Sequence, residues 1–166
     1  MSLQPQEITR RRSASALCAL LEDARDILLG SEGVFALNKV AVLTEDDGDV
    51  DTEIEQQVGA LGIVATVMLV SADNAGRNMP GPVFADTQLI VEISELAVVN
   101  RAGGGTQVTC LEAAEDAARS LHQARCASGR MLLVTNIRKY PQPPKPATVC
   151  YHVVCTTGDV QITKRS

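Results

Sequence analysis

The chain has 166 residues, of which 45% are apolar and only 2% are aromatic, so it is long enough to bury one core but must build that core from aliphatic side chains. Its formal net charge of -5 gives no general attraction to phosphate, and two Phe and two Tyr are too few for the base stacking of nucleic-acid modules. No apolar run approaches the ~20 residues of a membrane helix. We therefore expect neither a nucleic acid nor a membrane as partner.

The first elements in chain order are a helix, a strand and a second helix. Ser13 can cap a helix whose apolar residues recur at helical spacing until Gly30 ends it. The Val-rich and Ala-rich residues 39–43 predict a strand. The acidic segment 45–51 favours the start of a short helix that reaches Leu61, because carboxylates stabilise the positive end of a helix dipole.

The middle of the chain predicts two strands and a well-capped helix. Residues 63–70 are Val-rich and indicate a strand, which the turn-forming residues 73–82 end in a long loop. Residues 83–96 alternate apolar and polar side chains over a length that suits only a strand. Thr109 and Glu112 have the spacing of a capping box, which predicts the start of the next helix.

The last part of the chain predicts a hairpin with a wide loop. Residues 131–138 and 148–156 are strand-like, and the proline-rich residues 140–146 between them favour an extended connection. Strands that follow each other in sequence usually pair antiparallel. We therefore predict an α+β fold, with a mixed and mainly antiparallel sheet and helices packed on one face. The predicted divisions are a flexible segment at 1–12, a single domain at 13–158 and a tail at 159–166.

The segment that follows the arginines at positions 10–12 and the pattern of the five cysteines both predict a soluble cytoplasmic chain. Acidic residues interrupt the segment after the arginines, so it does not have the form of a signal peptide. The cysteines are odd in number, form no CxxC pair and lie in apolar segments, so we predict reduced, structural thiols. They are Cys18, Cys110, Cys126, Cys150 and Cys155.

A run of three glycines, Gly103, Gly104 and Gly105, precedes the capped helix. Backbone amides and a helix dipole at such a place can hold an anion. The run lacks the Lys and Ser/Thr order of a P-loop and the GxGxxG spacing of a dinucleotide site, so we favour a flexible connector. Anion binding by this loop remains the alternative.

No set of residues has the spacing of a metal or catalytic site. The carboxylates from Asp47 onward resemble a calcium loop, but the required Gly and Glu fall out of register, so helix capping is the better interpretation. On the strand predicted at 148–156, Cys150 and His152 share one face while Cys155 takes the other, and His122 is remote in sequence. We predict no catalytic residue, no metal and no cofactor.

The order of these elements resembles the tail terminator or tail-completion proteins of long-tailed bacteriophages, the group that includes minor tail protein U. The resemblance extends from about residue 14 to residue 154. It rests on the opening helix, VAVL at 40–43, DVDTEIE at 49–55, LGIV at 61–64, the strand at 83–95, Asn100 with Arg101, and the helix at 106–122. It implies a non-enzymatic protein that forms a ring, for which a hexamer is one candidate size, caps the tail tube and faces the head-side connector.

The resemblance also implies partners and a location. The partners are further copies of the chain, the tail tube protein and the connector protein, and the location is the virion, assembled in the cytoplasm of the bacterial host. Exposed loops and strand ends are where such contacts are expected. We predict partner contacts by Asn74, Arg77, Asn78, Glu92, Glu95, Asn100 and Arg101. One competing hypothesis is a small cytoplasmic ligand-binding domain or enzyme whose glycine loop holds an anionic ligand. Another is an adaptor or chaperone for a different assembly, which would have the same lack of a catalytic set but a different partner.

Overall fold

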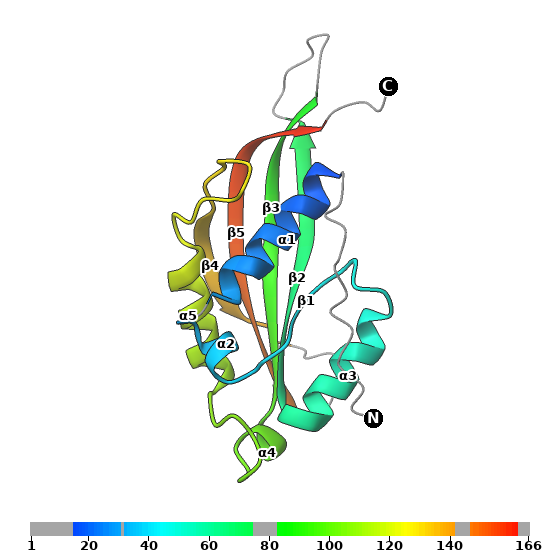
Figure 1. Cartoon of the computed structure of the whole chain (residues 1–166), viewed down its shortest axis with the longest axis vertical. Coiled ribbons are helices and arrows are strands. Elements are labelled where there is room, and N and C mark those ends of the chain that lie inside the picture. The colour runs from blue at the N-terminus through cyan, green and yellow to red at the C-terminus, as the bar shows by residue number, and fades with distance from the viewer. Residues whose placement is uncertain (1–14, 31, 75–82, 142–146, 163–166) are drawn as a thin grey trace, which may run out of the picture.

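The computed structural model of the chain describes residues 15–30, 32–74, 83–141 and 147–162. Five strands form one sheet in the order β1-β2-β3-β5-β4 (Figure 1). The pair β1 and β2 is parallel and the other three neighbouring pairs are antiparallel, so the predicted mixed, mainly antiparallel sheet is confirmed. The strands are β1 (Val42–Thr44), β2 (Ile63–Asn74), β3 (Val83–Leu96), β4 (Leu133–Lys139) and β5 (Thr148–Ile162).

The described part of the chain also contains three longer helices and two helices of a single turn. They are α1 (Ala16–Leu28), α2 (Val34–Leu37), α3 (Val50–Leu61), α4 (Ala97–Asn100) and α5 (Cys110–Leu121). The α+β class predicted from the sequence is confirmed, and the two single-turn helices were not predicted. None of the helices in the described residues is long and apolar enough to cross a membrane.

The main core lies between one face of the sheet and the helices α1, α2 and α5. Ile63, Ala65 and Val67 of β2 point into it, as the alternation of a strand requires. Val64 lies between them and points to the other face, where it packs against Val58 of α3. The sequence predicted all helices on one face of the sheet, and α3 corrects this because it packs on the opposite face. It lies there as the connection between the parallel strands β1 and β2.

The helix ends follow the capping chemistry of the sequence. The N-cap of α1 is Ser15, whose side chain accepts from the Cys18 amide, and the predicted cap Ser13 lies outside the described residues. Asp49 caps α3 in the same way, and Gly62 ends that helix in a left-handed conformation. The predicted capping box of α5 is present.

Two strands are longer than predicted. The strand β2 continues to Asn74 because its end pairs with β3, with Asn74 opposite Ala85, so cross-strand pairing overrides the turn-forming residues. The strand β5 runs through Ile162 and buries Val160 in the core, so the predicted domain boundary at residue 158 is wrong. The predicted flexible segment at 1–12 lies outside the described residues.

Candidate interaction site

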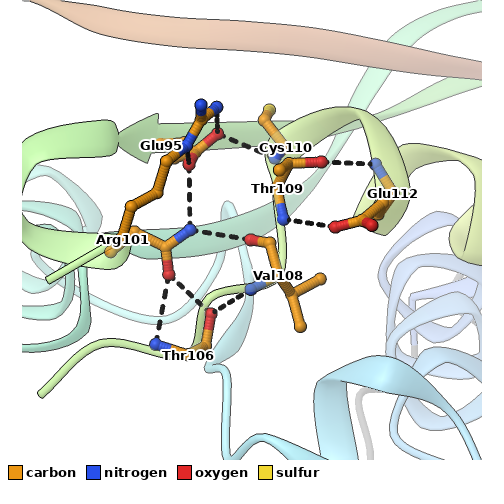
Figure 2. A network of polar contacts seen from close by, with 8 residues as sticks. Glu95, Arg101, Thr106, Val108, Thr109, Cys110 and Glu112 are labelled. Carbon is orange, nitrogen blue, oxygen red and sulfur yellow. Dashed lines mark hydrogen bonds and ion pairs between the residues drawn. The ribbon is translucent and has the colours of Figure 1, made fainter. Parts of the chain in front are cut away.

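A buried carboxylate organises the corner where β3 leads through α4 into α5. Glu95, at the end of β3, is 0% exposed. Its side chain accepts hydrogen bonds from Nδ2 of Asn100 at 2.9 Å, from Nε of Arg101 at 3.0 Å and from the backbone N–H of Cys110 at 2.8 Å. Figure 2 shows these contacts converging from α4 and from the first turn of α5. One side chain thus ties three elements together.

The donors around Glu95 keep it ionised. Burial alone would raise the pKa of this carboxyl, but the hydrogen bonds from Arg101, Asn100 and the Cys110 amide, with the charge of Arg101, outweigh it and leave the pKa below its usual range. The same contact raises the pKa of the Arg101 guanidinium. The corner therefore holds a buried negative charge whose partner, Arg101, has a side chain that is 55% exposed.

Asn100 is the second centre of this corner, and it is also 0% exposed. Its Nδ2 donates to the carbonyl of Val108 at 2.7 Å as well as to Glu95. Its Oδ1 accepts from the backbone N–H of Thr106 at 3.3 Å and from the Thr106 hydroxyl at 2.5 Å. The loop between α4 and α5 is therefore held from within by one amide side chain.

Two glycines make room for Asn100. A Cβ on Gly62 would lie 2.2 Å from the backbone nitrogen of Asn100, and a Cβ on Gly105 would lie 2.1 Å from its carbonyl oxygen. Gly103 and Gly104 face open space. The third glycine of the run is thus required by close backbone packing, so the interpretation of all three as a flexible connector needs correction.

The N-terminus of α5 is already occupied by carboxylates of the chain. The Cys110 amide donates to Glu95, the Thr109 amide donates to Glu112 at 2.8 Å, and the Glu112 amide donates to the Thr109 hydroxyl at 3.2 Å. An anionic ligand at this helix end would meet two negative charges and would have to displace them. This arrangement argues against an anion-binding glycine loop.

The structure places the predicted partner residues in different environments. Asn74 is exposed at the end of β2 and Arg101 is exposed beside α4. Glu95 and Asn100 are buried and bonded within their own chain, so their prediction as surface contacts is wrong. Glu92 is partly buried, and its carboxylate contacts the ring of His152 in the same sheet. Arg77 and Asn78 lie outside the described residues.

A signal for the burial of Glu95 was present in the sequence. Leu89, Val91 and Ile93 are fully buried and alternate along β3, and Glu95 is the next residue in that row. The sequence also gave no indication of Val98, which is 75% exposed on the single-turn helix α4 near Arg101. Val98 and Arg101 are accordingly among the residues that this corner exposes at the surface.

A second polar cluster lies on the strands β3 and β5. Glu92 and His152 are paired in register, and Nε2 of His152 lies 2.8 Å from Oε2 of Glu92. The Tyr140 ring stacks on the His152 ring with centroids 4.9 Å apart. Nδ1 of His152 is buried without a hydrogen-bond partner among the described residues. Cys150 shares this face, as predicted, and Cys155 faces the main core.

Ligand atoms of Glu92, Cys150 and His152 lie within 4.8 Å of one another. A tetrahedral zinc ion with bonds of about 2.0 to 2.3 Å holds its ligand atoms about 3.5 Å apart, so the cluster would have to contract around a metal. Burial, together with the charge of Glu92, raises the pKa of the Cys150 thiol to about 12, which favours its protonated form. The cluster is a hydrogen-bonded pair beside a neutral thiol, and we assign no metal to it.

The thiols give the first testable prediction. None of the five cysteines, all of which lie in the described part of the chain, forms a disulfide. Burial raises the pKa of Cys110, Cys150 and Cys155 to about 12 from 9.0, which lowers the thiolate fraction about a thousandfold. We expect 5,5'-dithiobis(2-nitrobenzoate) to modify half-buried Cys18 in the native protein and these three thiols only in urea. Fast native reaction of a variant that lacks both Cys18 and Cys126, Cys18→Ser/Cys126→Ser, would contradict this.

Comparison with known proteins adds a fold likeness. No protein-family model matches the chain, and no curated protein matches it in sequence. A solved structure described as the virion of a native gene transfer agent (GTA) particle contains a chain of similar fold, with a TM-score of 0.52 and 18% sequence identity. The alignment covers 90% of this chain and 99% of that chain. At this identity the likeness establishes a shared fold.

Proposed function

We propose that this protein is a non-enzymatic structural component of a phage or phage-like tail, which forms a ring that caps the tail tube and contacts the head-side connector. The observation that carries the proposal is the fold that the chain shares, over 90% of its length, with a chain of a virion particle. The sequence resemblance to tail terminators points independently in the same direction. In this function the protein acts within the virion, after assembly in the bacterial cytoplasm.

The rigid corner at α4 supports a role in assembly. Its polar groups are bonded within the chain, through Glu95 and Asn100, so the corner needs no ligand to keep its shape. It presents Val98 and Arg101 at its surface. An apolar side chain beside a cation on a rigid turn is suited to a protein contact, because little conformational entropy is lost when a partner binds. We propose this corner as a contact to the tube or connector.

The alternative function, a domain that holds an anionic ligand at the glycine loop, has less support. The amides at the start of α5 donate to Glu95 and Glu112, and Gly105 is packed against Asn100. The helix-start amides that an anion would use are therefore already bonded to carboxylates of the chain. This alternative predicts saturable binding of an anion by a monomer or dimer.

Light scattering across a concentration series, combined with negative-stain images, tests the proposed function. We expect a closed ring, either in the purified protein or when isolated tail tubes are added. A protein that is monomeric at every concentration, leaves tail tubes undecorated and binds inorganic phosphate saturably would reject the ring and support the ligand-binding domain.

A further inference from the structure

Charge is divided between two stretches of this chain. Residues 40–76 contain eight Asp and Glu and no Lys or Arg, whereas residues 117–158 contain six Lys and Arg and no Asp or Glu. The modest net charge of -5 conceals this division. A strong separation of charge along a sequence matters for association only if folding keeps the two stretches apart.

The strand order keeps them at opposite margins of the sheet. The acidic stretch contains β1, α3 and β2, and the basic stretch contains β4 and most of β5. In the order β1-β2-β3-β5-β4 these groups lie on either side of β3. Figure 1 shows α3 and β4 on opposite sides of the molecule. The protein is therefore acidic at one margin and basic at the other.

The basic margin is the strand β4, and it is available for a contact. Among the described residues β4 pairs only with β5. Near its start the Val134 N–H donates to Nδ1 of His122 at 3.2 Å, and beyond Val134 the other edge of β4 has no strand partner. Arg138 and Lys139 are exposed, and the side chain of neither has a hydrogen bond or an ion pair with another residue of the described ranges. Leu133 and Ile137 are 43% and 37% exposed on the same strand. These four residues define the basic margin.

The acidic margin lies on the turn after β1 and on the start of α3. Glu45, Asp46 and Asp51 are exposed there and define this margin. Glu45 accepts a hydrogen bond from the Leu69 amide at 2.9 Å. The side chains of Asp46 and Asp51 make no hydrogen bond or ion pair with any residue that the structure describes. Their charges are open to an external cation.

We propose that copies of this chain associate head to tail, with the basic margin of one copy against the acidic margin of the next. The two margins carry opposite charge, and both keep side chains that have no partner within the described chain. A contact between two different patches leaves one of each patch free, so further copies add until a ring closes, or without limit as an open filament if the rotation does not close. This inference rests on the proposed function for the ring, and it names the surfaces that would build it.

The charges would orient the contact more than they would supply its affinity. A single exposed ion pair contributes about 0 to 1 kcal/mol. Leu133, Ile137 and the open edge of β4 offer the apolar area and backbone groups that add affinity. Like charges brought together at such a contact are strongly unfavourable, so reversing the charge of one margin should prevent it.

Two variants test the contact by charge exchange. Arg138→Glu/Lys139→Glu makes both margins acidic, and Asp46→Lys/Asp51→Lys makes both basic. We expect each variant alone to associate at least about tenfold more weakly than the wild type. An equimolar mixture should recover assembly, because copies of the two variants can alternate with opposite charges at every contact. Raised salt should weaken the wild-type assembly.

Controls separate the contact from general effects of charge and folding. Lys39→Glu reverses an exposed lysine outside the basic margin and is matched to the single variant Lys139→Glu. We expect Lys39→Glu to assemble as the wild type and Lys139→Glu to assemble more weakly. Far-UV circular dichroism should be the same for all variants.

The outcomes distinguish this contact from the proposed function. Unchanged oligomer mass in both double variants would overturn the head-to-tail contact, and closed rings would still support the function. A wild type that stays monomeric at every concentration would also overturn the contact, and rings seen on tail tubes would keep the function. Recovery in the mixture as open filaments that never cap a tube would uphold the contact and reject the function.

Discussion

Gly105→Ala is expected to destabilise the fold by about 3 kcal/mol or more, the upper part of the range for overpacked sites. The added Cβ would lie 2.1 Å from the carbonyl oxygen of Asn100 and 2.4 Å from its carbonyl carbon. Both are backbone atoms of a residue that is itself fixed by hydrogen bonds to Glu95, Thr106 and Val108. The clash cannot be relieved by a side-chain rotation. It must move the backbone and break part of that network.

The neighbouring glycine provides a matched control. A Cβ on Gly104 meets no atom within 4 Å, so Gly104→Ala should change the free energy of unfolding by less than about 1 kcal/mol. Urea denaturation monitored by circular dichroism measures both values. Similar stabilities of the two variants would mean that Asn100 is not packed against Gly105 as described.

Glu95→Gln is the second change with a large expected effect, a loss of about 3 kcal/mol at neutral pH. Removing one partner of a buried charge pair leaves the other uncompensated, and such losses run to about 3 to 5 kcal/mol. Glutamine keeps the size of the side chain, and its single carbonyl oxygen can still accept from the Cys110 amide. That oxygen cannot also accept from both Asn100 and Arg101, so at least one of these donors loses its acceptor. Because Arg101 is half exposed and can turn to water, we expect the lower end of that range.

The pH dependence identifies the charge as the cause. The pKa of Glu95 is lowered in the folded protein, so its ionised form adds stability above the unfolded value of about 4.3. That contribution is lost as the pH falls from about 4.3 through the lower folded value. The difference in unfolding free energy between wild type and Glu95→Gln should therefore shrink over this acidic window. A constant difference across it would show that shape, rather than charge, explains the loss.

A variant that tests this corner as a partner contact must leave the hydrogen bonds of Glu95 intact, and Arg101 does not allow this. Its guanidinium is exposed, which suits a partner contact, and it also bonds Glu95 at 3.0 Å. Arg101→Glu would place a second carboxylate beside a buried one and would destabilise the loop. A loss of assembly in that variant would therefore not identify a contact. Val98→Ser, on the exposed side of α4, alters the surface without touching the network.

Local patterns in the sequence predicted much of the fold. The alternation at residues 83–96 and the capping box of Thr109 and Glu112 were both confirmed, because each depends on residues that are close together in the chain. The ends of β2 and β5 were predicted too short. The last residues of β2, SADN at 71–74, lack strand-like composition, and Gly158 with Asp159 interrupts the pattern of β5, but both ends are held by pairing with β3.

The candidate site was predicted less well, because it is assembled from distant segments. Polar side chains near predicted turns were expected at the surface, whereas Glu95 and Asn100 are buried beneath the start of α5. Glu92 meets His152 only because β3 pairs with β5, and no local pattern specifies that choice of neighbour. The roles of the three glycines were equally hard to predict. Only in the folded chain does Gly105 pack against the Asn100 backbone while Gly104 faces open space.

The sequence by itself determined the three longer helices, the approximate places of the strands and the division of charge, because period, capping and composition are properties of neighbouring residues. Only the tertiary structure decided what those elements do together. The order β1-β2-β3-β5-β4 carries the acidic and basic stretches to opposite margins. It also brings Gly62, Glu95 and Gly105 around one asparagine. Both results depend on which strands become neighbours, and that is settled by burial of the whole core rather than by any single segment.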